Sequence, residues 1–181
     1  MSNKLARPMV AVPDYLVGTI IVPDGVTLYP GDIVLANTYS TAISNNYSVF
    51  DATKPLTATL GEQMAIVIND GFEQLSDGRR PSGQPDYTQY EFIAGDVVTI
   101  IFLAPKLRFE VSYDAVTGTP VVGKFMYPTN DAYLLTVGVS IPAGTFSAMK
   151  VLALKNFRLG GQFGGEFAST AVAIVENPTP A

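Results

Sequence analysis

Two aspartates occupy positions where a carboxylate could take part in catalysis. Asp32 follows Gly31, Asp96 follows Gly95, and each stands before an apolar run. A pair of carboxylates in a cleft is what a glycoside hydrolase needs, with one serving as acid and the other as base or nucleophile. Aspartate after glycine is also common in turns, where its side chain accepts hydrogen bonds from nearby backbone N–H groups. Because the turn accounts for both residues, we predict structural roles for Asp32 and Asp96.

Ser147 and Lys150 match the S-x-x-K pattern of penicillin-recognising enzymes, in which the serine is the nucleophile. That chemistry needs the two side chains to face each other across one turn of a helix. Residues three apart in a strand point to opposite faces, and the sequence around Ser147 fits a strand as well as a helix. The companion motifs S-D-N and K-T-G are absent from the chain. We therefore interpret the match as chance.

Three acidic residues, Asp70, Glu73 and Asp77, could gather around a hard cation such as Ca²⁺, which prefers oxygen ligands. Their spacing does not fit an EF-hand loop, and Arg79 and Arg80 follow at once to neutralise them. A solvated charged loop explains the pattern better. The glycine-rich run 160–165 lacks the lysine of a phosphate-binding loop. We predict no metal site and no cofactor.

Basic and aromatic residues in loops are the better candidates for binding a partner protein. Arg79 and Arg80 form the most concentrated basic feature of an acidic chain, and arginine makes bidentate contacts with carboxylates. A solvated loop tip explains this pair equally well. Phe163 stands in the glycine-rich run, and Arg7 and Pro8 belong to an extended N-terminal segment. The residues predicted to bind a partner are Arg7, Pro8, Arg79, Arg80 and Phe163.

Composition excludes several classes of function. The 181-residue chain has no Cys and no His, which removes disulfide scaffolds, zinc fingers, thiol nucleophiles and Ser-His-Asp triads. A net charge of −5 and a pI near 4.6 disfavour nucleic-acid binding. No run approaches the roughly 20 apolar residues of a membrane-spanning helix. Charged residues make up only 15%, which suits a surface packed against other proteins. We predict a protein that is not an enzyme and binds neither nucleic acid nor a membrane.

The elements that must position these residues are strands. Residues 107–113 alternate between apolar and polar with a period of two, and residues 97–103 are apolar on both faces, as in a covered central strand. No segment sustains a helical apolar period over three turns. The sequence predicts an all-β barrel or sandwich of about ten to twelve short strands. The candidate strands are 9–12, 15–22, 32–37, 56–60, 63–68, 89–93, 97–103, 107–113, 121–126, 134–141, 148–154 and 168–175.

The chain is predicted to contain an extended N-terminal arm at 1–14, a β-domain at 15–176 and a frayed tail at 177–181. A Gly-Asp-strand pattern followed by a Gly-Glu-strand pattern ending in Asn occurs twice. This repetition suggests two related β-units, 15–70 and 89–176, joined by the long polar loop 71–88. Reuse of Gly-Asp turns, which any β-protein favours, explains the same likeness.

These features together resemble the small all-β capsid auxiliary proteins of tailed bacteriophages. The likeness rests on the two Gly-Asp-strand units, the turn at 141–145, the small-residue strand at 168–175 and the N-terminal arm. It implies a decoration or cement protein, made in the host cytoplasm and located on the capsid exterior of the virion. It further implies binding to the major capsid protein and to itself, as a homo-oligomer and most often a trimer. The arm would then straddle neighbouring subunits, and the domain is expected to fold without residues 1–13.

Two other classes of function stay open. A carbohydrate-binding head-fibre or tail component would need exposed aromatic side chains on a concave face, and the chain has nine Tyr but no Trp. A polysaccharide-active enzyme would need a carboxylate pair in a cleft, and it is the less favoured of the two.

Overall fold

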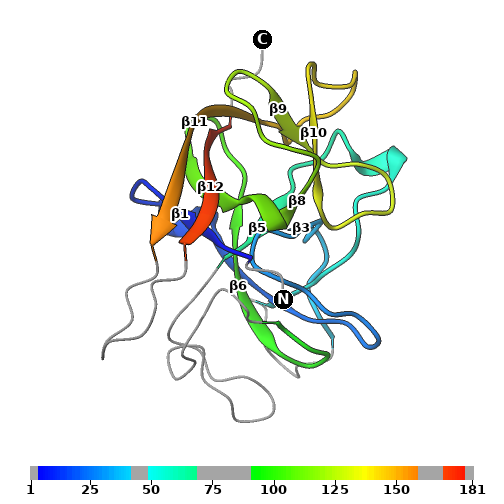
Figure 1. Cartoon of the computed structure of the whole chain (residues 1–181). Helices are drawn as coiled ribbons and strands as arrows, with labels where there is room; N and C mark the ends of the chain where they lie inside the picture. The colour runs from blue at the N-terminus through cyan, green and yellow to red at the C-terminus, as the bar shows by residue number, and fades with distance from the viewer. Residues whose placement is uncertain (1–3, 42–48, 69–90, 159–168, 178–181) are drawn as a thin grey trace, which may run out of the picture.

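Two curled open sheets form the protein, and the only helices among the described residues are short 3-10 turns (Figure 1). The computed structural model describes residues 4–41, 49–68, 91–158 and 169–177. Within them lie twelve strands, so the prediction of an all-β fold with ten to twelve short strands is confirmed. The seven-stranded sheet has the order β1 (Ala6–Pro8), β7 (Arg108–Ser112), β12 (Ser169–Glu176), β11 (Met149–Arg158), β9 (Phe125–Tyr127), β10 (Leu135–Gly138), β8 (Val116–Thr117). The five-stranded sheet has the order β3 (Ile33–Val34), β5 (Ala65–Val67), β6 (Val97–Phe102), β2 (Val17–Ile21), β4 (Val49–Asp51).

The five-stranded sheet is covered on both faces, as the apolar run at 97–103 predicts. In β6, Ile100 packs into one apolar cluster and Ile101 into another, on opposite faces of the sheet. In β5, Ile66 likewise faces one cluster while Ala65 and Val67 face the other. The cluster around Ile101 also contains residues of the seven-stranded sheet, so it forms the core between the two sheets.

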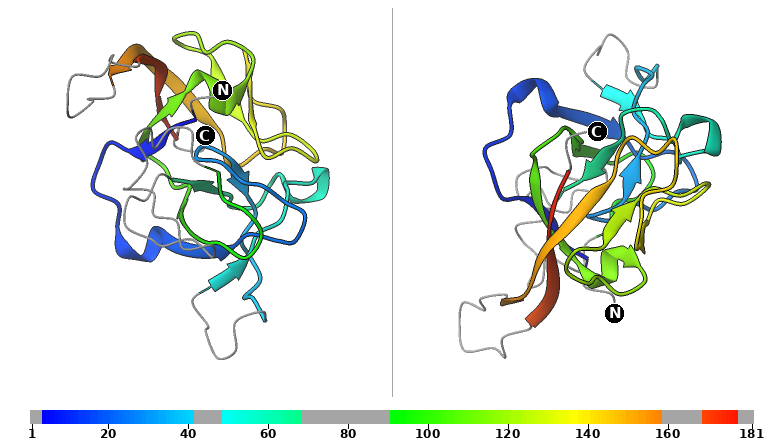
Figure 2. Two further views of the ribbon diagram at one scale, coloured as in Figure 1. Left: turned by 60° about the horizontal axis from the view of Figure 1, so that its bottom comes forward. Right: turned by 90° about the horizontal axis from the view of Figure 1, so that it is seen from above.

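The seven-stranded sheet follows the alternation seen in the sequence. Phe109 and Val111 of β7 are fully buried in the core between the sheets, whereas Arg108 on the opposite face is exposed. Strands β11 and β12 pair over most of their length, with a shift of register between Val151 and Ala153 that marks a β-bulge. Figure 2 shows this two-stranded ribbon at the margin of the molecule.

Part of the N-terminal arm belongs to the protein's own sheet. Residues Ala6–Pro8 form β1, which pairs with β7 along its whole length, and Leu5 and Ala6 are completely buried. The Leu5 N–H donates to the Ser112 hydroxyl oxygen at 2.8 Å. Removing residues 1–13 would delete an edge strand and two core side chains. The expectation that the domain folds without them stays a prediction, and the structure gives a reason against it, because their apolar surface and backbone hydrogen bonds would be lost.

Several strand boundaries also differ from the sequence prediction. The candidate strand at 9–12 lies earlier, as β1, and the candidate at 56–60 is a 3-10 helix, η2 (Thr57–Thr59). Strand β10 ends at Gly138, so Val139 is 77% exposed instead of sharing a buried face with Leu135. Apart from β1, the strands up to β6 form the five-stranded sheet and those from β7 onward form the seven-stranded sheet, so the chain changes sheet between β6 and β7 and not at the polar loop 71–88. That loop lies outside the described residues.

Candidate functional site

The two Gly-Asp turns have the same geometry, and they define the site's framework. Gly31 and Gly95 both adopt a left-handed backbone, with φ of 95° and 86°. In each turn the aspartate Oδ2 accepts a backbone N–H three residues earlier at 2.8 Å, from Tyr29 to Asp32 and from Ile93 to Asp96. The prediction that these carboxylates serve as turn caps agrees with these hydrogen bonds.

The two turns are also joined to the sheet in the same way. Gly31 N–H donates to the carbonyl of Val67, whose own N–H donates to the carbonyl of Asp32. Gly95 and Asp96 make the corresponding pair of hydrogen bonds with Val22. Just before the turns, Leu28 and Phe92 exchange both backbone hydrogen bonds with each other. The Gly-Asp part of the repetition seen in the sequence therefore corresponds to a repetition of local structure.

The turn at Asp32 lines a pocket. The cavity has a volume of about 300 Å³ and lies where the N-terminal segment, the Asp32 turn, the strand β8 and the loop before β10 meet. Its wall consists of Lys4, Thr27, Tyr29, Asp32, Lys54, Thr117, Asp131, Ala132, Tyr133 and Leu134. The site thus joins both sheets and collects residues that are far apart in the sequence.

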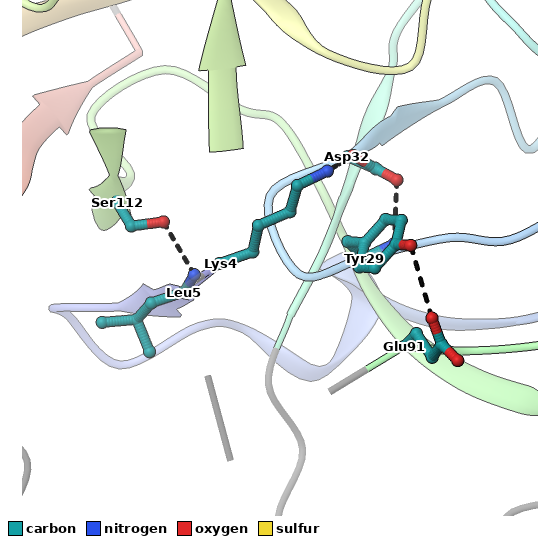
Figure 3. A network of polar contacts seen from close by, with 6 residues as sticks. All are labelled: Lys4, Leu5, Tyr29, Asp32, Glu91 and Ser112. Atoms are coloured by element: carbon teal, nitrogen blue, oxygen red, sulfur yellow. Dashed lines mark hydrogen bonds and ion pairs between the residues drawn. The ribbon is translucent and has the colours of Figure 1, made fainter. Parts of the chain in front are cut away.

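A buried carboxylate and a nearby ammonium form the inner wall of the pocket (Figure 3). The Lys4 ammonium lies 4.0 Å from Asp32 Oδ1 and 3.9 Å from the centroid of the Tyr29 ring. Only 3% of the Asp32 side chain is exposed. Its Oδ1 atom accepts no hydrogen bond from any described residue, because the Lys4 ammonium is too distant. Asp32 Oδ1 is thus a buried acceptor that solvent does not reach and for which no described residue supplies a donor.

The outer wall carries a second charge pair. Lys54 Nζ lies 3.2 Å from an Asp131 carboxylate oxygen and 5.5 Å from the centroid of the Tyr133 ring. Asp131 has a left-handed backbone with φ of 55°, held by a 2.8 Å hydrogen bond from its N–H to the carbonyl of Pro55. Such conformations are uncommon outside glycine, although aspartate tolerates them. The loop at 131–134 is thereby fixed over the pocket.

Burial governs the electrostatics of the site. Loss of solvation raises the pKa of Asp32 from 3.8 to about 6, although the Lys4 ammonium and the Tyr29 N–H both act to lower it. Burial raises the pKa of Tyr133 as well, and the nearby carboxylates of Asp32 and Asp131 raise it further. The pKa of Tyr29 is raised by burial and then by Glu91, whose carboxylate lies 3.4 Å from the Tyr29 hydroxyl. Asp32 therefore changes charge near pH 6, about two pH units above an ordinary aspartate.

A second cluster of charges lies on the seven-stranded sheet. Glu110 is 1% exposed and forms ion pairs with both Arg7 and Lys155, which come from β1 and β11. Arg7 stands opposite Glu110 in the register of β1 and β7. The partner-binding candidate Arg7 is thus engaged within its own sheet, and Pro8 beside it is partly buried in the same edge strand.

The segment that joins β1 to β2 presents apolar side chains to solvent. Met9 is 42% exposed, Val10 39%, Tyr15 81% and Val17 44%, while Leu16 among them is buried. Isolated exposed apolar residues are ordinary, but here four of them fall within nine residues of sequence beside an edge strand. In the sequence this segment falls in the predicted arm at 1–14 and the candidate strand at 15–22, and no pattern there distinguishes these four side chains.

The structure places the other candidates as follows. Ser147 is completely buried and its hydroxyl oxygen accepts the Met64 N–H at 2.9 Å, whereas Lys150 is exposed, so the S-x-x-K pattern is not a nucleophilic pair. Arg79, Arg80 and Phe163 lie outside the described residues. So do the acidic residues Asp70, Glu73 and Asp77.

Among the described residues, no three acidic, His or Cys side chains gather as metal ligands would. In the same part of the chain, no helix has the length and apolarity to cross a membrane. No protein-family model, curated protein or solved structure matches this chain.

Proposed function

We propose that this protein is a structural component of a tailed-bacteriophage virion, which binds the outer surface of the capsid lattice and stabilises it. The capsid assignment comes from the resemblance of the sequence to capsid auxiliary proteins. The observation that carries a protein-binding role is the exposed apolar segment formed by Met9, Val10, Tyr15 and Val17. We call these four residues the apolar segment.

The apolar segment is suited to a protein interface because of its composition and its location. Tyrosine and methionine are enriched at interfaces, and Tyr15 is the most exposed of the large apolar side chains in the described chain. The segment continues from β1, an edge strand of the seven-stranded sheet. An edge strand with adjoining apolar side chains can receive both main-chain and side-chain contacts from a partner. Many such modest contacts, repeated over a lattice, give strong overall binding.

The arrangement of β1 changes how the N-terminal arm can contribute. In this structure β1 pairs with β7 of its own chain, so it is not free to add as an extra strand to a sheet of a neighbouring capsid subunit. The contact with the capsid is instead proposed to run through the exposed residues that follow β1. As a homo-oligomer, with the trimer implied by the resemblance, the protein would present this segment several times to neighbouring capsid subunits.

The first test is saturation binding to mature heads that lack the protein. After co-sedimentation, hundreds of copies per head are expected for a lattice-wide decoration protein, since each of many equivalent sites is filled. A dozen copies would indicate a vertex or tail component, and no binding would contradict the proposal.

The second test replaces Tyr15 with Ser in the full chain. Loss of a large aromatic side chain from an interface is expected to weaken head binding about tenfold or more. Because Tyr15 is 81% exposed, its substitution should leave the denaturation midpoint unchanged. Val139→Ser is the matched control, since Val139 is 77% exposed but lies outside the segment. Equal binding by Tyr15→Ser and Val139→Ser would contradict the role of the apolar segment.

A further inference from the structure

We propose that the outer edge of β11 pairs with the same edge of a second copy of this chain, antiparallel and across a two-fold axis. The ribbon formed by β11 and β12 lies at the margin of the molecule (Figures 1 and 2). This inference does not depend on capsid binding, because it concerns the chain alone in solution. It also differs from the trimer that the sequence resemblance implies, since a two-fold contact closes with two copies.

Most of β11 has a neighbouring strand on one side only. Its pairing with β9 is limited to Met149 and Lys150, and the turn at 121–124 adds two backbone hydrogen bonds at Val151. Over residues 153–158, β11 pairs with β12 and with no other described strand. We call the side of residues 153–158 that faces away from β12 the free edge.

The alternation of the ladders shows which backbone groups point out from the free edge. In an antiparallel ladder, residues bonded to one neighbour alternate with residues whose N–H and carbonyl point the other way. Ser112 of β7 donates its N–H to β1, and the registers of β7 with β12 and of β12 with β11 carry this alternation across the sheet. Ala153 and Lys155 therefore bond to β12, whereas Leu154 and Asn156 direct their backbone groups outward. No other described residue bonds to them from that side.

Exposed apolar side chains flank the free edge. Leu152 is 37% exposed and Leu154 41%. Val121 and Val122, which are 43% and 57% exposed, belong to the turn that bonds to Val151, just before the free edge begins. An added strand would cover backbone groups and apolar surface together, which is how an open sheet edge binds a partner.

The strands at the ends of the two sheets offer less. β4 is covered by residues 38–40, because the Ser40 N–H donates to the Val49 carbonyl and the Asp51 N–H donates to the Thr38 carbonyl. The end strands β1, β3 and β8 have three, two and two residues. The free edge of β11 is longer than any of these three strands, so it can form more backbone hydrogen bonds with a partner.

A second copy of this chain is the partner that the free edge fits. Two identical strand edges are complementary when they run antiparallel, since each outward N–H then meets an outward carbonyl. An edge lysine with a free charge would oppose such pairing. Lys155 instead forms an ion pair with the buried Glu110 of its own sheet, so its charge is already compensated.

The register follows from the groups that must meet. Outward residues of one copy have to face outward residues of the other, so the two-fold axis passes beside Leu154, Lys155 or Asn156. An axis at Leu154 would direct the partner strand into the turn at 121–124, and an axis at Lys155 would crowd two lysines directly opposite each other. An axis at Asn156 avoids both, and it gives about six backbone hydrogen bonds between the copies.

The test combines sedimentation velocity of the full chain over a range of concentrations with amide hydrogen exchange followed by NMR. The chain is expected to form a dimer as its concentration rises. The amides of Leu154 and Asn156 should become protected from exchange over the same range, because they acquire acceptors in the second copy. A chain that stays monomeric would overturn the proposal. So would a dimer or trimer in which these two amides exchange as fast as in the monomer.

Two variants test the edge itself. Leu154→Pro removes one outward N–H and leaves the hydrogen bonds between β11 and β12 in place, so it should weaken dimerisation about tenfold or more. Leu154→Lys keeps the backbone N–H and places an uncompensated charge on the free edge, with an expected weakening of about tenfold, and it serves where proline disturbs the strand. Val139→Lys is the matched control, since Val139 is 77% exposed and lies outside β11. Dimerisation of Leu154→Lys as tight as that of Val139→Lys would refute the assignment.

Discussion

Acidification should stabilise this protein through Asp32, in contrast to the usual behaviour of a buried carboxylate in an ion pair. The perturbation is a change of pH between 4 and 7, applied to the native chain and to Asp32→Asn. Burial raises the pKa of Asp32 from 3.8 to about 6, so the native state binds this proton more tightly than the unfolded state does. The contribution to stability is therefore fully present below the unfolded pKa of 3.8, and it is lost as the pH rises from there through about 6.

The size of the effect follows from the pKa difference. The pKa of Asp32 is about two units higher in the folded state than in the unfolded state, which corresponds to roughly 3 kcal/mol of unfolding free energy. Asp32→Asn cannot titrate, so subtracting its stability from that of the native chain isolates this one group from all other carboxylates. The difference should fall by roughly 2 kcal/mol between pH 4 and pH 7, because part of the effect is already lost at pH 4. The Lys4 ammonium lowers the pKa of Asp32, so Lys4→Met should move the transition to a higher pH.

The assay is urea denaturation at half-unit steps of pH, with the side-chain carboxyl carbon of Asp32 followed by ¹³C NMR. The resonance is expected to titrate with a midpoint near 6. A midpoint near 4, or a stability difference that stays flat from pH 4 to 7, would refute the reasoning. It would show that Lys4 and the Tyr29 N–H compensate the burial of the charge completely.

Three further substitutions test the framework, each by the midpoint of chemical denaturation. Gly31→Ala should lower the free energy of unfolding by about 2–4 kcal/mol, because φ is 95° and the new Cβ would lie 2.6 Å from the Cβ of Ala115. Gly25→Ala is the control: φ there is 72° but the new Cβ meets open space, so the loss should be less than half as large. Glu110→Gln should cost about 1–3 kcal/mol, because two cations would lose their buried carboxylate, and an unchanged midpoint would contradict this. Ser147→Ala should cost about 1–3 kcal/mol by leaving a buried backbone N–H without an acceptor, and a neutral result would count against that hydrogen bond.

Which side chains of a strand face the core was predictable, because the alternation of apolar and polar residues depends only on residues close together in the sequence. Phe109 and Val111 share a buried face, and Ile100 and Ile101 face two different clusters, as their sequence pattern indicates. The boundaries of short strands were less predictable. At residues 56–60 the apolar–polar alternation resembles a strand, yet the Thr59 hydroxyl accepts the Leu56 N–H and a 3-10 turn forms. A threonine hydroxyl can accept a backbone N–H that would otherwise pair in a sheet, and the apolar–polar pattern does not show when this happens.

The pocket could not be predicted, since its residues meet only through tertiary contacts. Lys4 reaches Asp32 because the N-terminal segment pairs as β1 with β7, and no short-range signal specifies that pairing. Asp131 and Tyr133 arrive on a loop whose backbone is held by Pro55 and by Ile33. The one usable signal was Gly31-Asp32, and it correctly indicated a turn without indicating a cavity.

The two Gly-Asp turns explain why one motif gives two different sites. Their hydrogen bonds to Val67 and Val22 correspond one for one, so the sequence likeness reflects the same local structure twice. The surroundings differ. At the first turn, the Ile33 N–H donates to the Tyr133 carbonyl at 2.7 Å, which holds the 131–134 loop beside Asp32, and Lys4 approaches from the other sheet. The turn supplies a rigid, buried carboxylate, and at Asp32 the N-terminal segment and this loop complete the wall of a pocket beside it.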